Sequence, residues 1–183
     1  SVLASSLGRE LGMTLGRTVD YTGRQFYAQH REFAAAFPWR TRLHLMNALD
    51  THDTPRFATS ARAGAVPVAL GLAMTMPGIP VVWAGDEFGF TAADGEQART
   101  PIPWARIDDH AEPIALYRRM IALRRAHPAL NDGGMRWVHV SDDAVAFVRE
   151  APSECVLVVA ARDAVPRLPA ASSGRPSRRP PAG

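Results

Sequence analysis

The chain has 183 residues, 46% of them apolar, so it can bury a core and is expected to form one domain or one domain with part of another. Its formal charge of +3 could suggest a nucleic-acid partner, but three arginines in the last twelve residues, SSGRPSRRPPAG, account for the whole excess. We therefore expect no nucleic-acid partner. Pro, Ser, Gly and Arg at this density predict a disordered tail over 169–183.

The sequence also argues against disulfides, export and membrane insertion. Cys155 is the single cysteine, which excludes an internal disulfide and a cysteine-rich metal site. Residues 63–85 carry no charge and could span a bilayer, but Pro67 and the sequence MPGIP divide them into a helix and a strand. The first residues, SVLASSLGRE, do not resemble a signal peptide. We therefore expect a cytoplasmic protein with no membrane partner.

Helical and strand-like segments alternate along the first two thirds of the chain. The predicted elements are a helix over 23–36, a buried strand over 42–50, a helix from Thr54 to Gly78, a buried strand over 79–84, a loop over 85–104 and a helix over about 110–127. The helical segments have apolar residues at three-and-four spacing, whereas the strand segments are short and apolar throughout. Pro38 and Pro128 stop the first and last helices.

The hydrophobic period changes after Asn131. The segments MRWVHV, AVAFVR and ECVLVVA are separated by connections of hairpin length, so they predict three antiparallel strands. Strand–helix alternation followed by such a meander predicts an α/β fold that continues into an all-β domain.

Polar clusters follow both predicted strands of the α/β part. THD (51–53) and GDE (85–87) each lie just past a strand, and in parallel α/β folds these carboxyl ends converge on one mouth. The Asp53 carboxylate could be a nucleophile, a base, a metal ligand or an acceptor for sugar hydroxyls, and His52 could donate to an oxygen that gains charge. The alternative is that Asp53 caps the next helix. No second histidine lies at ligand spacing, and we expect neither a metal nor a cofactor.

The motifs THDTPR, GIPVVWAGDEFG and RTPIPW together resemble the last part of the catalytic barrel of the α-amylase family of glycoside hydrolases (family 13). The sequence TAADGEQARTPIPW is similar to neopullulanase-like and α-glucosidase-like members, and LYRRMIALRRAHPAL is similar to the eighth helix of the family. The resemblance covers about residues 37–163. It implies an α/β fold, the C-terminal portion of a TIM (β/α)8 barrel followed by a partial antiparallel β-sandwich.

The implied domain division has three parts. Residues 1–130 would form a partial catalytic barrel, with about its last two strand–helix units and a preceding helix. Residues 131–168 would begin the C-terminal β domain, and 169–183 would be the tail.

The resemblance also implies roles for individual residues. Asp53 becomes the transition-state-stabilising carboxylate, which grips sugar hydroxyls where the bond breaks, and His52 donates to the same sugar. The other implied substrate-binding residues are Arg56, Trp83, Asp86, Glu87 and Arg99, with Trp104 as a further candidate for the wall of the site. For Arg56 we favour orienting the loop over touching sugar.

The bond-forming groups of the family have no counterpart in the sequence. A retaining glycosidase needs a nucleophile and a general acid about 5 to 5.5 Å apart, and nothing here resembles the family's G-F-R-x-D motif. The prediction is a fragment of a retaining α-glucan hydrolase, inactive alone, whose partners are an α-glucan oligosaccharide and the preceding part of the barrel. One alternative is a non-catalytic carbohydrate-binding or assembly protein derived from the same barrel. Another, within the family, is a glucosyl transferase or an isomerase such as a trehalose synthase.

Overall fold

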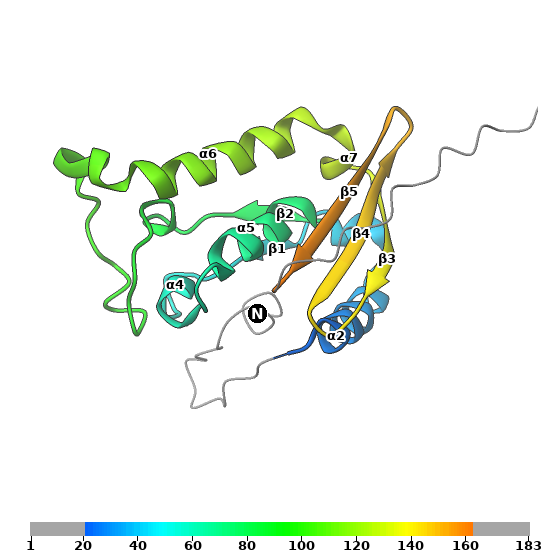
Figure 1. Ribbon diagram of the computed structural model, residues 1–183, viewed down its shortest axis with the longest axis horizontal. Coiled ribbons are helices and arrows are strands. Elements are labelled where there is room, and N and C mark those ends of the chain that lie inside the picture. Colours follow the sequence, from blue (N-terminus) through cyan, green and yellow to red (C-terminus); the bar gives the residue numbers. More distant parts are fainter. Residues whose placement is uncertain (1–20, 163–183) are drawn as a thin grey trace, which may run out of the picture.

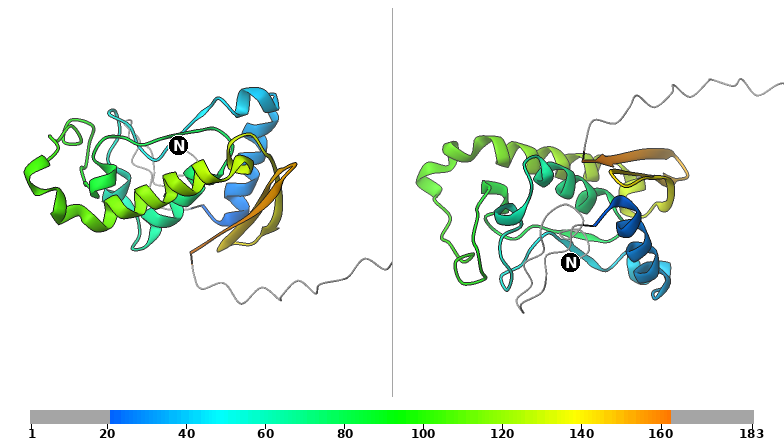
Figure 2. Two further views of the ribbon diagram at one scale, coloured as in Figure 1. Left: turned by 90° about the horizontal axis from the view of Figure 1, so that it is seen from above. Right: turned by 60° about the horizontal axis from the view of Figure 1, so that its bottom comes forward.

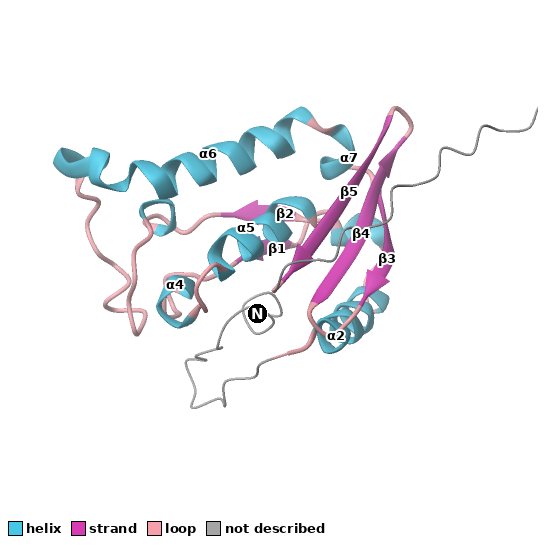
Figure 3. Cartoon of the chain, viewed as in Figure 1, coloured by secondary structure: helices cyan, strands magenta, loops and turns pink. Residues whose placement is uncertain are grey.

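The structure is a computed structural model that describes residues 21–162, so the tail predicted over 169–183 lies outside the described residues. Figure 1 shows the arrangement of the elements, and Figure 3 distinguishes helices from strands. In chain order they are α2 (Gly23–Ala35), α3 (Trp39–Arg42), β1 (Met46–Ala48), α4 (Phe57–Ser60), α5 (Ala65–Thr75), β2 (Ile79–Val81), η1 (Asp86–Phe88), η2 (Trp104–His110), α6 (Ala111–Ala126), α7 (Pro128–Asn131), β3 (Gly134–Val140), β4 (Ala144–Ala151) and β5 (Glu154–Ala161).

Strands β1 and β2 form a parallel pair, as predicted, with Met46 opposite Ile79 and Ala48 opposite Val81. Both strands are shorter than the predicted segments. The first loses its N-terminal half because Arg42 belongs to α3 and residues 43–45 form a turn. Parallel pairing places the segments after the two strands at the same edge, which confirms the expected placement of THD and GDE.

The helix between these strands begins later than the sequence suggested. The prediction of a continuous helix from Thr54 was wrong. Residues 51–54 form a turn, and α4 is a single helical turn. The longer helix α5 starts at Ala65, after Gly64 adopts a left-handed conformation with φ of 76°. Its residues are largely apolar and largely buried, so packing rather than a side-chain cap stabilises it.

The predicted three-stranded antiparallel sheet is confirmed, with the order β3-β4-β5. The central strand β4 supplies most of the buried residues, and Phe147 is fully buried. The Trp137 ring meets the rings of Phe147 and Phe26 edge-on, with centroids 5.3 and 6.1 Å apart. Edge-on contacts of this kind favour a fixed packing of the sheet on α2.

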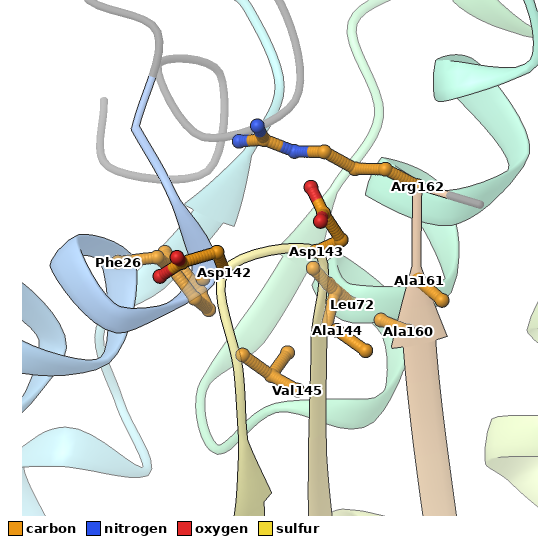
Figure 4. A pocket seen from close by; sticks show the side chains of 10 residues that line it. Phe26, Leu72, Asp142, Asp143, Ala144, Val145, Ala160, Ala161 and Arg162 are labelled. Atoms are coloured by element: carbon orange, nitrogen blue, oxygen red, sulfur yellow. The ribbon is translucent and has the colours of Figure 1, made fainter. Parts of the chain in front are cut away.

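The sheet stands across one end of the α/β part, as the two views of Figure 2 show. Helix α2 contacts β3 and β4, α5 contacts β5, and α6 packs along α5. A cavity of about 30 Å³ lies where α2 and α5 meet the ends of β4 and β5, beside Asp142 and Asp143 (Figure 4). No helix within residues 21–162 is long and apolar enough to cross a bilayer.

Two arginines bind the carbonyl oxygens at the C-terminal end of α5. Arg124 of α6 donates to the carbonyls of Met74 and Gly78, at 2.7 and 2.6 Å. The fully buried Arg149 of β4 donates to the carbonyl of Thr75, and burial lowers its pKa to about 10. These bonds satisfy carbonyls that the end of a helix leaves unpaired.

Candidate functional site

The turn after β1 presents a histidine and an aspartate to solvent. The hydroxyl oxygen of Thr54 accepts from the backbone N–H of Thr51 at 2.9 Å, and the Thr51 carbonyl accepts from the Thr54 N–H at 3.2 Å. These bonds fix a tight turn that leaves the side chains of His52 and Asp53 58% and 53% exposed. His52 Nε2 lies 3.2 Å from Asp53 Oδ2. The two polar groups therefore lie side by side and accessible to a ligand.

The loop after β2 packs directly on this turn through Gly95. A Cβ atom at this position would lie 2.9 Å from the carbonyl oxygen of His52 and 3.1 Å from the backbone carbon of Asp53. The same loop brings Arg99 to Asp53, with 4.0 Å between Nη2 and Oδ1, while Arg99 Nη1 lies 3.1 Å from Glu96 Oε1. Only glycine allows so close an approach, so Gly95 brings Arg99 beside the exposed pair.

Arg56 and Asp86 are brought together, but beneath the surface. Arg56 is 1% exposed, and its Nη1 donates to Asp86 Oδ1 at 2.7 Å. Its Nη2 donates to the carbonyls of Ala84 and Ala98 at 2.6 and 2.7 Å, and its guanidinium lies over the Trp83 ring. Because these contacts occupy both terminal nitrogens, Arg56 has little left to offer a sugar. Orientation of the loop, which the sequence analysis favoured for Arg56, agrees with this geometry.

The other predicted site residues lie around the same edge. The Trp83 ring lies 5.9 Å from the His52 ring, and within residues 21–162 its buried Nε1–H has no hydrogen-bond partner. Glu87 is occupied locally, since its Oε2 accepts from the Gly85 N–H at 2.8 Å. Trp104 is 72% exposed, and its ring stands nearly perpendicular to that of Phe88, with 6.3 Å between the centroids. Trp83 therefore adjoins the exposed pair, whereas Glu87 shapes the loop.

Sequence reasoning missed Asp50, which ends the apolar run directly before THD. Its side chain is buried, and its Oδ2 accepts from the Phe57 N–H at 2.6 Å. Burial raises its pKa, against the hydrogen bond from Phe57. Burial and then the charge of Asp50 raise the pKa of Asp86 to about 7, against the hydrogen bond from Arg56. An acidic residue inside an apolar strand end was the available signal.

The described part of the chain, residues 21–162, holds no group of three or more His, Cys, Asp or Glu side chains arranged to bind a metal ion. The exposed His52–Asp53 pair, flanked by Arg99 and Trp83, offers a hydrogen-bond donor, an acceptor and a ring face. Such a set suits a polyhydroxylated ligand, because hydroxyl groups both donate and accept and sugar rings pack on aromatic faces.

Comparison with known proteins finds relatives that align with most of the chain. The chain is 30% identical over 157 residues to neopullulanase 2 of Thermoactinomyces vulgaris and 29% identical over 133 residues to a cyclomaltodextrinase of a Bacillus species. These alignments cover 84% and 70% of this chain but 27% and 24% of the relatives. A solved cyclomaltodextrinase superposes on 76% of the chain and 24% of its own, with a TM-score of 0.71 and 26% identity.

The chain thus spans about a quarter of the length of the curated relatives that it matches. No family model matches the sequence. The similarity to these proteins therefore rests on pairwise alignments over most of this chain and on the fold.

Proposed function

Since the chain belongs to the α-amylase family of glycoside hydrolases (family 13), we propose that it supplies the C-terminal part of a catalytic barrel to an enzyme that acts on α-glucans. The observation that carries the proposal is the exposed His52–Asp53 pair at the shared carboxyl edge of two parallel strands. In this proposal residues 1–130 belong to the barrel and 131–168 begin a β-sandwich. A cytoplasmic location is part of the same proposal.

Asp53 is the proposed transition-state-stabilising carboxylate. A carboxylate that accepts from sugar hydroxyls binds more strongly as the ring flattens toward an oxocarbenium-like transition state, so it lowers the barrier without forming a bond. His52, 3.2 Å from Asp53, would donate to a neighbouring oxygen of the same sugar. The solvent exposure of both side chains supports these roles.

The surrounding residues divide between contact and positioning. Arg99 and Trp83 would contact the sugar, because they approach Asp53 and His52 from the neighbouring loop. Arg56, Asp86 and Glu87 would position that loop, since their polar atoms bond to protein groups. These three residues, which the sequence also suggested as substrate-binding residues, are thus proposed to position the loop.

Bond cleavage is proposed to need groups from outside this chain. No segment of the sequence matches the family's nucleophile motif, and without a nucleophile and a general acid the remaining contacts bind sugar without breaking bonds. We expect no release of reducing sugar when the purified chain is incubated with maltooligosaccharides. Hydrolysis that Asp53→Asn abolishes would contradict this part of the proposal.

Binding tests the site itself. Isothermal titration with maltotriose should detect a weak complex, and Asp53→Asn should weaken it about tenfold or more, because a hydrogen bond to a charged group contributes about 1.5–3 kcal/mol. Asp109→Asn is the matched control, since Asp109 is exposed and pairs with Arg106 away from the turn. Equal affinity in all three proteins would refute a role for Asp53.

A further inference from the structure

Two buried carboxyl groups face a single guanidinium beneath the candidate site. The side chain of Asp86 is 9% exposed, Asp50 is 6% exposed and Arg56 is 1% exposed. Of these two carboxyl groups, only that of Asp86 makes an ion pair with Arg56, at 2.7 Å. If both carboxyl groups were ionised, one negative charge would remain uncompensated in a buried place, which costs several kcal/mol.

The hydrogen-bond partners of the two carboxyl groups indicate how the second negative charge is neutralised. Asp50 Oδ2 accepts from the Phe57 N–H, and Asp86 Oδ1 accepts from Arg56. Asp50 Oδ1 is fully buried, and as an ionised oxygen it has no donor among the described residues. The Asp50 and Asp86 side chains line the same cavity, and each lies close enough to change the pKa of the other. Two facing carboxylates both accept, so only a proton on one of them completes a hydrogen bond between them.

We infer that Asp50 and Asp86, the acid pair, share one proton, and that the resulting hydrogen bond holds the segments after β1 and β2 together beneath the exposed His52–Asp53 pair. The acid pair acts as a positioning device, because neither residue reaches the exposed surface of the turn. The single proton belongs to the pair rather than to one residue.

Other charged and titratable groups also face the acid pair. Arg56 comes from the segment before α4 and Tyr117 from α6, and the charge of Glu87 in η1 acts on the Tyr117 phenol. Glu112 and Arg119 of α6 line the same cavity of about 600 Å³, which Asp50, Asp86 and Tyr117 also line. Burial, followed by Asp86 and Asp50, raises the pKa of the Tyr117 phenol, so this group stays neutral. Both acids therefore border a cavity through which the acid pair can exchange its proton.

The expected pH dependence follows from the raised pKa of both acids. A native state that binds a proton more tightly than the unfolded state loses stability as the pH rises through that window. For Asp86 the window runs from its ordinary value of 3.8 to about 7. The hydrogen bond is present below this upper limit and is lost above it, where two ionised carboxylates repel each other.

Single Asp-to-Asn variants test the inference. Asp86→Asn and Asp50→Asn each replace the protonated acid by a neutral amide that can still donate to the remaining carboxylate. The free energy of unfolding of each variant, minus that of the wild type, should rise from about pH 4 to about pH 7 and level off above it. The Asp109→Asn control should give a flat difference. The difference also cancels the titration of His30, which all four proteins share.

Infrared spectroscopy of the wild type supplies a second readout that does not depend on a variant's folding. A band of a protonated carboxyl group should persist at pH 6 and vanish above about pH 7, and both single variants should lack it. Absence of this band at pH 6, or flat differences for both variants, would overturn the inference. The double variant should be less stable than either single variant, because it leaves the Arg56 charge buried without a carboxylate.

The link to ligand rests on the proposed function. If the acid pair positions the turn, the affinity for maltotriose should fall above about pH 7 in the wild type and not in Asp86→Asn. An infrared band that is present at pH 6 and disappears above about pH 7, in a protein that binds no maltotriose at any pH, would support the shared proton and contradict the glucan site. The two failures are therefore distinguishable.

Discussion

Arg56 and Asp86 form a buried ion pair, with 2.7 Å between Nη1 and Oδ1, that joins the segment after β1 to the segment after β2. Arg56 also donates to the carbonyls of Ala84 and Ala98 and therefore bridges parts of the chain that lie 28 and 42 positions away in sequence. One side chain thus organises the loops on which the candidate site is built.

Replacement of Arg56 should be costly. Arg56→Ala leaves the Asp86 charge and two carbonyls unpaired in a buried place, so we expect a loss of about 3–5 kcal/mol in the free energy of unfolding. Arg56→Lys should recover little, because an ammonium group cannot reproduce the planar fork that serves three acceptors. Urea denaturation measures both, with the exposed Arg106→Ala as control. A loss below about 1 kcal/mol would mean that the bridge contributes little.

Two glycines form a matched pair of substitutions. Gly95→Ala would force a Cβ to within 2.9 Å of the His52 carbonyl, so the loop must move away from the turn and carry Arg99 with it. We expect weaker binding of maltotriose and lower stability. Gly71 lies inside α5 with no atom within 4 Å of an added Cβ, so Gly71→Ala should stabilise the protein by about 0.5–1 kcal/mol. Similar effects of the two changes would contradict this account.

His30 should destabilise the protein in acid. Burial, and then the charge of Arg42, lower its pKa to about 4, and its ring packs 5.3 Å from that of Trp137. The unfolded chain binds a proton near the ordinary value of 6.5 while the native state does not, so stability falls as the pH drops from about 6.5 to about 4. His30→Leu should flatten this part of the profile in thermal unfolding followed by circular dichroism. An unchanged slope would show that other groups produce it.

His52 should matter for binding and not for folding. Its side chain is 58% exposed, and it contacts the Asp53 carboxylate and the ring of Trp83. We expect His52→Ala to change the free energy of unfolding by less than about 0.5 kcal/mol while it weakens binding of maltotriose several-fold. Nuclear magnetic resonance titration would locate the loss, since shifts of the Arg99 and Trp83 signals should shrink together. Normal binding by the variant would remove His52 from the site.

Sequence periodicity was sufficient to predict most of the helices and strands and to place the ends of the two parallel strands at one edge. Residues 46–48 and 79–81 pair in parallel as expected. The prediction that both strands are buried was wrong, because they lie at least partly exposed, with Met46 at 75% and Ile79 at 47%. The start of α5 could not be read in the same way. Thr54 and Pro55 are good helix-starting residues. The Thr54 hydroxyl instead donates to the Thr51 carbonyl, and the Arg56 side chain donates to the Ala84 carbonyl in the loop after β2.

The sequence also could not predict which polar side chains at this edge are exposed and which are buried. Sequence places Arg56, Asp86 and Asp53 near one edge, but whether a side chain points outward or is buried depends on partners far along the chain, such as the Ala98 carbonyl. The same holds for Asp50, whose importance appears only when Asp86 lies beside it. Contacts at such sequence separations leave no local pattern.

The last turn of α5 is completed by side chains that arrive late during synthesis. Arg149, which bonds the Thr75 carbonyl, lies 74 positions further along the chain, and Arg124, which bonds the Met74 carbonyl, lies 50 positions further. A ribosome must therefore release α6 and β4 before α5 can complete its hydrogen bonds. The α/β segment therefore reaches its final order only after β4 of the antiparallel sheet has been synthesised.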